Sequence, residues 1–254
     1  MSVPEGEQQR VLIVGGYGGL GAVICEQFAE TGASVAVAGR SAEKATELAE
    51  KLTANGATAM GLALDVTDSA SIDAAVAQVE AAWGGIDVLV NSASKLITVP
   101  AEHFDDAQWA EVVNANLVGA FLLSKSVGKH MLARGGGRII HLSSVRADAG
   151  GRMGFSAYGA SKAGVNLLVK QLATEWAARG VTVNAVAPGF MRTDFVEAAQ
   201  QNQQFVARLQ QRIPIGRFAE PEEVASAVIY LATPLARFIN GQIIYVDGGV
   251  TASH

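Results

Sequence analysis

The chain is poor in cysteine, and this excludes two kinds of site. Cys25 is the only cysteine among 254 residues, so no intrachain disulfide can form and a thiolate metal site lacks its ligands. The four histidines show no ligand-like clustering; they are His103, His130, His141 and His254. We therefore expect no metal site, and in particular no zinc enzyme.

The chain also lacks an excess of positive charge. It holds 19 Lys and Arg residues against 24 Asp and Glu residues, which gives a net charge of −5. A nucleic-acid partner requires a basic surface, so we expect none. Proline is scarce as well: six prolines stand against 28 glycines without a Gly-X-Y period, which excludes a collagen-like chain.

Long apolar runs are missing too. None reaches the roughly 18 apolar residues that cross a bilayer, so we expect no membrane partner. The uncharged stretch 11–25 does not resemble a signal peptide, because Glu5 and Glu7 precede it. Glu26 and Glu30 then follow at helical spacing. We expect a cytoplasmic protein.

Short runs rich in valine and isoleucine alternate with longer segments of helical period. Continuous apolar character predicts strands buried on both faces, as in a parallel sheet. The predicted strands are 11–14, 34–38, 59–64, 87–90, 138–142, 181–187 and 243–246; the predicted helices are 19–31, 42–55, 69–83, 106–134, 157–179 and 221–233. This order predicts an α/β fold, a doubly wound, Rossmann-type parallel sheet of about seven strands with helices on both faces. No linker divides the chain, so we predict a single domain over 1–254.

A glycine-rich turn follows the first predicted strand. Glycines at such a turn bring backbone N–H groups against a pyrophosphate at a helix N-terminus. Two spacings overlap here, G-x-G-x-x-G and G-x-x-x-G-x-G. The turn predicts a dinucleotide site made of Gly15, Gly16, Tyr17, Gly18, Gly19, Leu20 and Gly21.

The second predicted strand indicates which dinucleotide binds. An NAD site usually places an acid there to bond the ribose 2′-OH, but this strand ends in Arg40 and Ser41. A guanidinium pairs with a 2′-phosphate through charge-assisted hydrogen bonds, and Ser41 adds a donor. We therefore expect NADP(H) to be favoured over NAD(H).

Tyr158 and Lys162 lie four residues apart at the start of a predicted helix and so share one face. A nearby ammonium favours the phenolate and lowers the pKa of a tyrosine, which makes proton exchange with an alcohol or a carbonyl feasible. Ser144 ends the strand before this helix, at the edge where the fold binds its ligands. These residues point to carbonyl–alcohol chemistry.

Together these motifs resemble the short-chain dehydrogenase/reductase family, in its single-domain branch of about 250 residues, from residue 11 to residue 249. The resemblance implies a catalytic tetrad of Asn116, Ser144, Tyr158 and Lys162. In it, Tyr158 donates a proton to a carbonyl oxygen to which Ser144 also hydrogen-bonds. Lys162 lowers the tyrosine pKa and holds the nicotinamide ribose, and Asn116 supports a proton relay.

The resemblance also extends the cofactor site beyond the glycine turn. Asp65 matches the acid that bonds the adenine amino group, and Thr193 matches the threonine that contacts the nicotinamide amide. The remaining expected cofactor contacts are Val66, Asn91, Ser92, Ala93, Pro188 and Gly189, together with Tyr158 and Lys162. Three places depart from the family pattern. Val14 replaces a threonine, and Gly18 occupies a place that is often basic in NADP-preferring members. The segment Asn91–Ser94 keeps the first asparagine of the family's N-N-A-G but loses the second asparagine and the glycine.

For the substrate we expect contacts from Ser144, Tyr158, Arg146 and Arg152. The two arginines either attract a carboxylate, a phosphate or a carrier-protein acid, or they are solvated or lie at a subunit contact. The segment 194–211 is either a mobile lid or an ordinary surface helix.

The sequence therefore predicts an NADP(H)-dependent oxidoreductase that interconverts a secondary alcohol and a ketone of a small molecule. One alternative is a 3-oxoacyl-(acyl-carrier-protein) reductase; another is a sugar-acid, polyol or cyclic-alcohol dehydrogenase. A protein that binds NADP(H) for regulation without turnover is the alternative from a different class. The resemblance further implies a homotetramer paired through the predicted helices 106–134 and 157–179.

Overall fold

A computed structural model describes residues 8–151, 154–192 and 203–253. It holds one parallel sheet of seven strands in the order β3-β2-β1-β4-β5-β6-β7. The strands are β1 (Arg10–Val14), β2 (Ser34–Gly39), β3 (Thr58–Ala63), β4 (Val88–Asn91), β5 (Gly137–Leu142), β6 (Val181–Pro188) and β7 (Ile243–Val246). The predicted fold class is confirmed, and the strand bounds shift by at most one residue.

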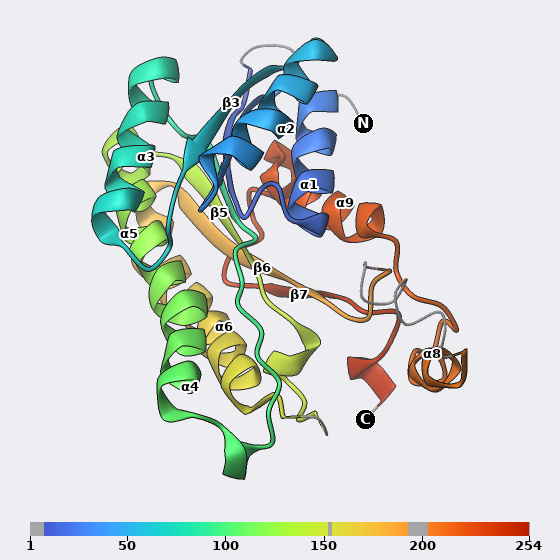
Figure 1. Ribbon diagram of the computed structural model, residues 1–254. Coiled ribbons are helices and arrows are strands. Elements are labelled where there is room, and N and C mark those ends of the chain that lie inside the picture. Colours follow the sequence, from blue (N-terminus) through green and yellow to red (C-terminus); the bar gives the residue numbers. More distant parts are fainter. Residues whose placement is uncertain (1–7, 152–153, 193–202, 254) are drawn as a thin grey trace.

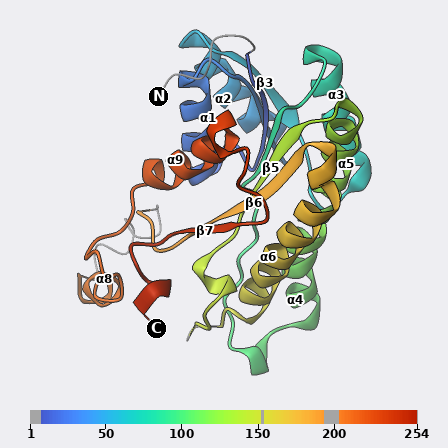
Figure 2. The same ribbon diagram turned by 180° about the vertical axis from the view of Figure 1, so that it is seen from behind.

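Helices cover both faces of the sheet (Figures 1 and 2). On one face, α1 (Gly19–Glu30), α2 (Ala42–Ala54) and α9 (Pro221–Ala232) share an apolar core with the sheet. On the other, α3 (Ser69–Trp83), α5 (Gly119–Arg134) and α6 (Ser156–Trp176) share the second core. The strands are buried between these layers, which explains their continuous apolar sequence.

The prediction of one continuous helix over 106–134 is wrong. It consists of α4 (Asp106–Val113), a π-helical turn (Asn114–Val118) and α5. In that turn the N–H of Gly119 bonds the carbonyl of Asn114, five residues back. Such turns are found frequently at functional sites, and Asn116 lies inside this one.

Shorter elements complete the chain. The predicted helix 157–179 ends as α6 at Trp176, and a 3-10 turn (Ala177–Arg179) follows. Of the segment 194–211, the structure describes only α8 (Gln203–Gln210) and the turn after it. In both views α8 lies away from the sheet and near the C-terminus.

The strand register brings the expected site residues to one edge. Val14 of β1 pairs with Ala38 of β2 and with Asn91 of β4, and Asn91 pairs with His141 of β5. The chain reverses its winding direction between β1 and β4, because β2 and β3 extend to one side and β5 to β7 to the other. Ligands of such sheets bind at the carboxyl ends of the strands at this point.

Candidate active site

A pocket of about 270 Å³ opens at the carboxyl ends of β1, β4, β5 and β6. Eleven residues expected in the site line it: Gly15, Gly18, Gly19, Leu20, Gly21, Ser92, Ser144, Tyr158, Lys162, Pro188 and Gly189. Ser94, Leu142, Ser143 and Met191 complete its wall. The glycine turn and the Tyr158–Lys162 pair therefore face one space.

The glycine turn has no room for side chains at Gly15 and Gly21 but is open at Gly19. Gly15 has φ +77°, and a Cβ there would lie 2.7 Å from the backbone nitrogen of Ala93. A Cβ on Gly21 would overlap the carbonyl oxygen of Gly15. At Gly19, by contrast, a Cβ would meet nothing within 4 Å.

The N-terminus of α1 begins at this turn, and its cap residue Gly18 makes no side-chain capping bond. The first N–H groups of a helix lack partners inside the helix and attract anions. An uncapped helix N-terminus beside an open Gly19 fits the pyrophosphate of a dinucleotide. The loss of the family threonine at Val14 is offset by the backbone, since Gly15 and Gly16 both donate N–H bonds to Ala38 O, at 2.8 and 3.1 Å.

Four of the expected cofactor residues lie outside the pocket lining, where β2 and β3 end: Tyr17, Arg40, Ser41 and Asp65. Tyr17 covers Gly39, and its hydroxyl accepts the backbone N–H of Ser41 at 2.9 Å. Ser41 caps α2, because its hydroxyl accepts the N–H of Lys44 at 3.2 Å. The backbone donor of Ser41 is thus engaged by Tyr17, whereas its hydroxyl proton has no acceptor among the residues that the structure describes.

Arg40 is exposed, and its charge helps to lower the pKa of Asp65. The larger causes of that lowering are the N–H and the hydroxyl of Thr67, which both bond one Asp65 oxygen, at 2.8 and 2.7 Å. A guanidinium and a carboxylate therefore lie where β2 and β3 end.

The pKa of Tyr158 differs from the expected one. Lys162 was expected to lower its pKa, yet the pKa of Tyr158 is raised, because burial disfavours the phenolate. Hydrogen bonds with Ser144 and Ser94 and the charge of Arg146 oppose this rise. The physical reason is that the Lys162 ammonium lies 5.7 Å from the ring centre and bonds elsewhere.

Lys162 is 2% exposed and donates a hydrogen bond from Nζ to Leu142 O at 2.7 Å. Burial lowers its pKa to about 8. An ammonium has three donors, so this bond to the end of β5 leaves donors for a ligand in the pocket that Lys162 lines.

Asn116 is buried in the π-helical turn, and both its side-chain oxygen and its side-chain nitrogen are hydrogen-bonded. Its Oδ1 accepts the N–H of Lys95 at 2.7 Å, and its Nδ2 donates to Lys95 O at 2.9 Å and to Ser161 Oγ at 3.0 Å. Ser161 is the neighbour of Lys162 on α6. Asn116 thus joins the loop after β4 to the helix that carries Tyr158 and Lys162.

Asn91 belongs to a buried polar chain beneath the pocket. Its Nδ2 bonds His141 Nδ1 at 3.3 Å, its Oδ1 accepts the N–H of Ala93 at 3.2 Å, and His141 Nε2 bonds Ser124 Oγ at 2.9 Å. Burial, and next the charge of Lys162, lower the pKa of His141 to about 3. His141 is therefore neutral and structural.

The remaining expected residues have mixed outcomes. Gly189 lies so close to Asp247 that a Cβ would approach its Cα to 2.8 Å, and Val66 packs against Gly119. Thr193 and Arg152 lie outside the described residues. Ser94 was missed although it stands beside Asn91–Ala93, and its only sequence signal was a hydroxyl at the end of β4.

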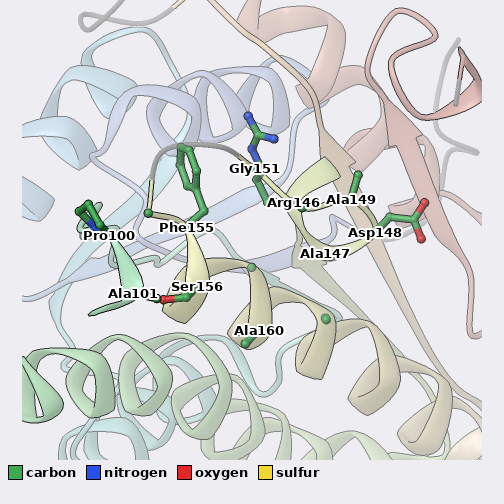
Figure 3. A pocket seen from close by; sticks show the side chains of 14 residues that line it. Pro100, Ala101, Arg146, Ala147, Asp148, Ala149, Gly151, Phe155, Ser156 and Ala160 are labelled. Carbon is green, nitrogen blue, oxygen red and sulfur yellow. The ribbon is translucent and has the colours of Figure 1, made fainter. Parts of the chain in front are cut away.

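Arg146 lies on a 3-10 turn (Val145–Ala147) after β5, and its backbone N–H bonds Ser144 Oγ at 3.1 Å. It borders a second pocket of about 540 Å³, drawn in Figure 3. In that view Phe155 lies beside Arg146, whereas Asp148 points away from it. The guanidinium carbon is 4.7 Å from the centre of the Phe155 ring.

Comparison with known proteins identifies the family of this chain. A family model described as "Enoyl-(Acyl carrier protein) reductase" matches residues 15–251. The gluconate 5-dehydrogenase of Gluconobacter oxydans (strain 621H) is 34% identical over 96% of this chain and 95% of its own. The 3-oxoacyl-(acyl-carrier-protein) reductase FabG of Vibrio harveyi is 39% identical over 96% and 98%.

A solved structure shows the same fold. The gluconate 5-dehydrogenase of Burkholderia cenocepacia J2315, in complex with NADP and tartrate, superposes with a TM-score of 0.92. It is 35% identical, and the match covers 97% of this chain and 96% of the other.

The chain belongs to the short-chain dehydrogenase/reductase family. It is an oxidoreductase of that family, whose relatives are named dehydrogenases and reductases of CH–OH and carbonyl substrates. Within the described ranges, no helix is long and apolar enough to cross a membrane. The same ranges hold no cluster of three or more His, Cys, Asp or Glu side chains able to bind a metal.

Proposed function

We propose that this protein is an NADP(H)-dependent oxidoreductase that interconverts a secondary alcohol and a ketone, with Tyr158 as general acid and base. The observation that carries the proposal is the Tyr158 hydroxyl, which is hydrogen-bonded to Ser144 and Ser94 in the pocket that the glycine turn also lines. A proton donor and a dinucleotide turn in one pocket are the two parts that carbonyl reduction requires.

When bound, the nicotinamide supplies the hydride, and the chain supplies the proton and the electrostatics. In reduction Tyr158 donates its proton to the carbonyl oxygen. Ser144 donates a hydrogen bond to the same oxygen and stabilises its developing charge, which it can do because its backbone-facing lone pair accepts the N–H of Arg146. In oxidation Tyr158 takes the proton from the alcohol.

Lys162 and Asn116 support this proton transfer. Lys162 keeps a positive charge near the ring of Tyr158 and offers its free donors to the ribose of the cofactor. Asn116 acts as a positioning residue, because it ties Lys95 to Ser161 on α6. The raised pKa of Tyr158 keeps the phenol protonated near neutral pH, the form that reduction uses.

We propose that NADP(H) is preferred over NAD(H), with Arg40 and Ser41 holding the 2′-phosphate. The support is the exposed Arg40 guanidinium at the N-terminus of α2, together with the hydroxyl of Ser41. Arg40→Ala is expected to lower the ratio of kcat/KM with NADPH to kcat/KM with NADH by about tenfold or more. An unchanged ratio would remove Arg40 from the cofactor site.

We also propose that the active form is a cytoplasmic homotetramer. Its support is a set of large apolar side chains that remain exposed on α4, α5, α6 and α9: Trp109, Phe121, Leu167 and Tyr230. Exposed apolar surface of this kind marks sites of association.

The test of the proposed activity is Tyr158→Phe. It removes the hydroxyl and keeps the ring, so we expect turnover with NADPH to fall at least about 100-fold while NADPH binding, followed by fluorescence, stays the same. Turnover that survives the substitution would refute the mechanism. NADPH binding without turnover in either form, across ketones, keto acids and keto-sugars, would instead support a regulatory protein.

A further inference from the structure

Two arginines from distant parts of the chain lie on one aromatic ring beside the pocket. The guanidinium carbon of Arg146 is 5.8 Å from the centre of the Phe190 ring, and that of Arg212 is 5.5 Å from it. Phe190 stands between Gly189 and Met191, which both line the pocket with Tyr158. The two cations therefore border the site of the proposed reaction.

Arg146 is held in place by its surroundings. Its guanidinium packs on Phe155, and a Cβ on Gly151 would come within 2.9 Å of its Nη1. Burial, and next the charge of Arg212, lower its pKa, and a negative charge on Tyr158 raises it. The pKa of Arg146 therefore depends on the charges of both Arg212 and Tyr158.

No acid neutralises this pair within the described residues. Neither arginine forms an ion pair there, and Asp148 points away from Arg146 in Figure 3. Among the acids that the structure describes, Glu220 pairs with Arg192, and Glu223 pairs with Arg217. Two like charges beside a partly buried ring repel each other unless an anion lies between them.

We propose that Arg146 and Arg212 bind a carboxylate of the substrate, so that this enzyme acts on a hydroxy acid and its keto acid. The inference rests on the function proposed above and goes further by naming the substrate class. A guanidinium matches a carboxylate with two parallel N–H···O bonds. Because Arg146 also interacts with Tyr158, the carboxylate belongs to the same small molecule as the reacting carbonyl.

The burial of Arg146 favours a small acid over an acidic carrier protein. A carrier protein would meet exposed cations at the rim, whereas Arg146 is half-buried among Phe155, Gly151 and Phe190. A bound carboxylate also offsets the positive charge that lowers the pKa of Tyr158. Keto-acid binding would thereby keep Tyr158 protonated, ready to donate.

The first experiment measures binding without turnover. Tartrate and threitol have the same carbon chain and hydroxyls and differ only in carboxylate against hydroxymethyl groups. Calorimetry with the protein saturated with NADP⁺ is expected to give a Kd for tartrate at least about tenfold below that for threitol. Arg146→Gln and Arg212→Gln should each remove this difference.

The second experiment measures turnover on another matched pair. The probes are 5-ketogluconate and L-sorbose, which again differ by a carboxylate against a hydroxymethyl group. The acid-to-neutral ratio of kcat/KM with NADPH is expected to fall at least about tenfold in Arg146→Gln and in Arg212→Gln. The control is Arg208→Gln on α8, the same loss of charge nearby, for which we expect a ratio within about twofold of the unmodified protein.

The two experiments separate this inference from the proposed function. If neutral substrates react in a Tyr158-dependent way and acids have no advantage, the carboxylate site is wrong and the oxidoreductase stands. If Arg208→Gln lowers the ratio as much as Arg212→Gln, the effect is long-range charge and the site is again wrong. If nothing turns over, tartrate binding still decides: equal Kd values for tartrate and threitol overturn the inference.

Discussion

Tyr158 and Lys162 are both shifted by burial toward their neutral forms. Burial raises the pKa of the phenol, and it lowers that of the ammonium to about 8. The hydrogen bonds of Ser144 and Ser94 are the main interactions that oppose the rise in the pKa of Tyr158. They lower this pKa more than Lys162 does. The pKa of Tyr158 therefore depends on the hydroxyls of Ser94 and Ser144, which follow β4 and β5, as well as on the Tyr–Lys spacing.

Ser94→Ala tests this electrostatic role. Without the Ser94 bond the pKa of Tyr158 should rise further, so a smaller fraction is deprotonated at a given pH. Alcohol oxidation requires that deprotonated form, so the acidic limb of its kcat/KM profile should move to higher pH, with about a tenfold loss below the limb. Ketone reduction at neutral pH uses the protonated form and should change less; a limb that stays in place would contradict this role.

Lys162→Met tests how much the buried ammonium lowers the free energy of unfolding. The folded-state pKa of about 8 lies below the ordinary 10.5, so below pH 8 the charge destabilises the folded protein fully. As pH rises from about 8 to 10.5 the folded state loses its proton first, and stability increases. Lys162→Met should abolish this increase and raise the free energy of unfolding at pH 7 by about 2 kcal/mol. Denaturant unfolding at pH 7 and pH 10 measures both effects, and a destabilised variant at pH 7 would contradict them.

At the level of elements, two glycines of the β1–α1 turn have different roles: Gly21 is required for the fold, and Gly19 leaves space for a ligand. A Cβ on Gly21 would overlap the Gly15 carbonyl, whereas a Cβ on Gly19 enters open space in the pocket. Gly21→Ala should therefore lower Tm by several degrees or more. Gly19→Ala should leave Tm within about one degree and weaken NADPH binding about tenfold or more, because its methyl group occupies the space of the pyrophosphate. A thermal shift series with and without NADPH would show whether the two effects separate in this way.

The elements also show what the sequence could predict. The strands and the glycine turn follow from local spacing and composition, and the structure agrees with both. Helix 106–134 could not be resolved into α4, a π-helical turn and α5, because a π-helical turn inserts a residue without a composition signal. Neither the contact of Ser94 with Tyr158 nor the approach of Arg212 to Arg146 could be foreseen, since both arise from long-range packing.

At the scale of the whole molecule, each layer of helices keeps apolar side chains in solvent. Phe121 on α5 is 44% exposed, and Phe238, after α9, is 100% exposed. Figure 2 shows α9 and the α4–α6 group on opposite sides of the sheet. A chain with one apolar surface on each side can pair through both, and two independent two-fold interfaces generate a tetramer.

This arrangement predicts how the proposed tetramer dissociates when one surface is changed. Phe121→Asp places a charge on the α5 side and should leave dimers that are joined through the other surface; Phe238→Asp should leave dimers joined through α5 and α6. The double variant should be a monomer, because each surface loses its apolar contact and a buried unpaired charge is costly. Light scattering coupled to size-exclusion chromatography measures all three masses. Since Tyr158 and its pocket are built within one chain, the dimers should retain turnover, and an unmodified protein that elutes as a monomer would overturn the assembly proposed here.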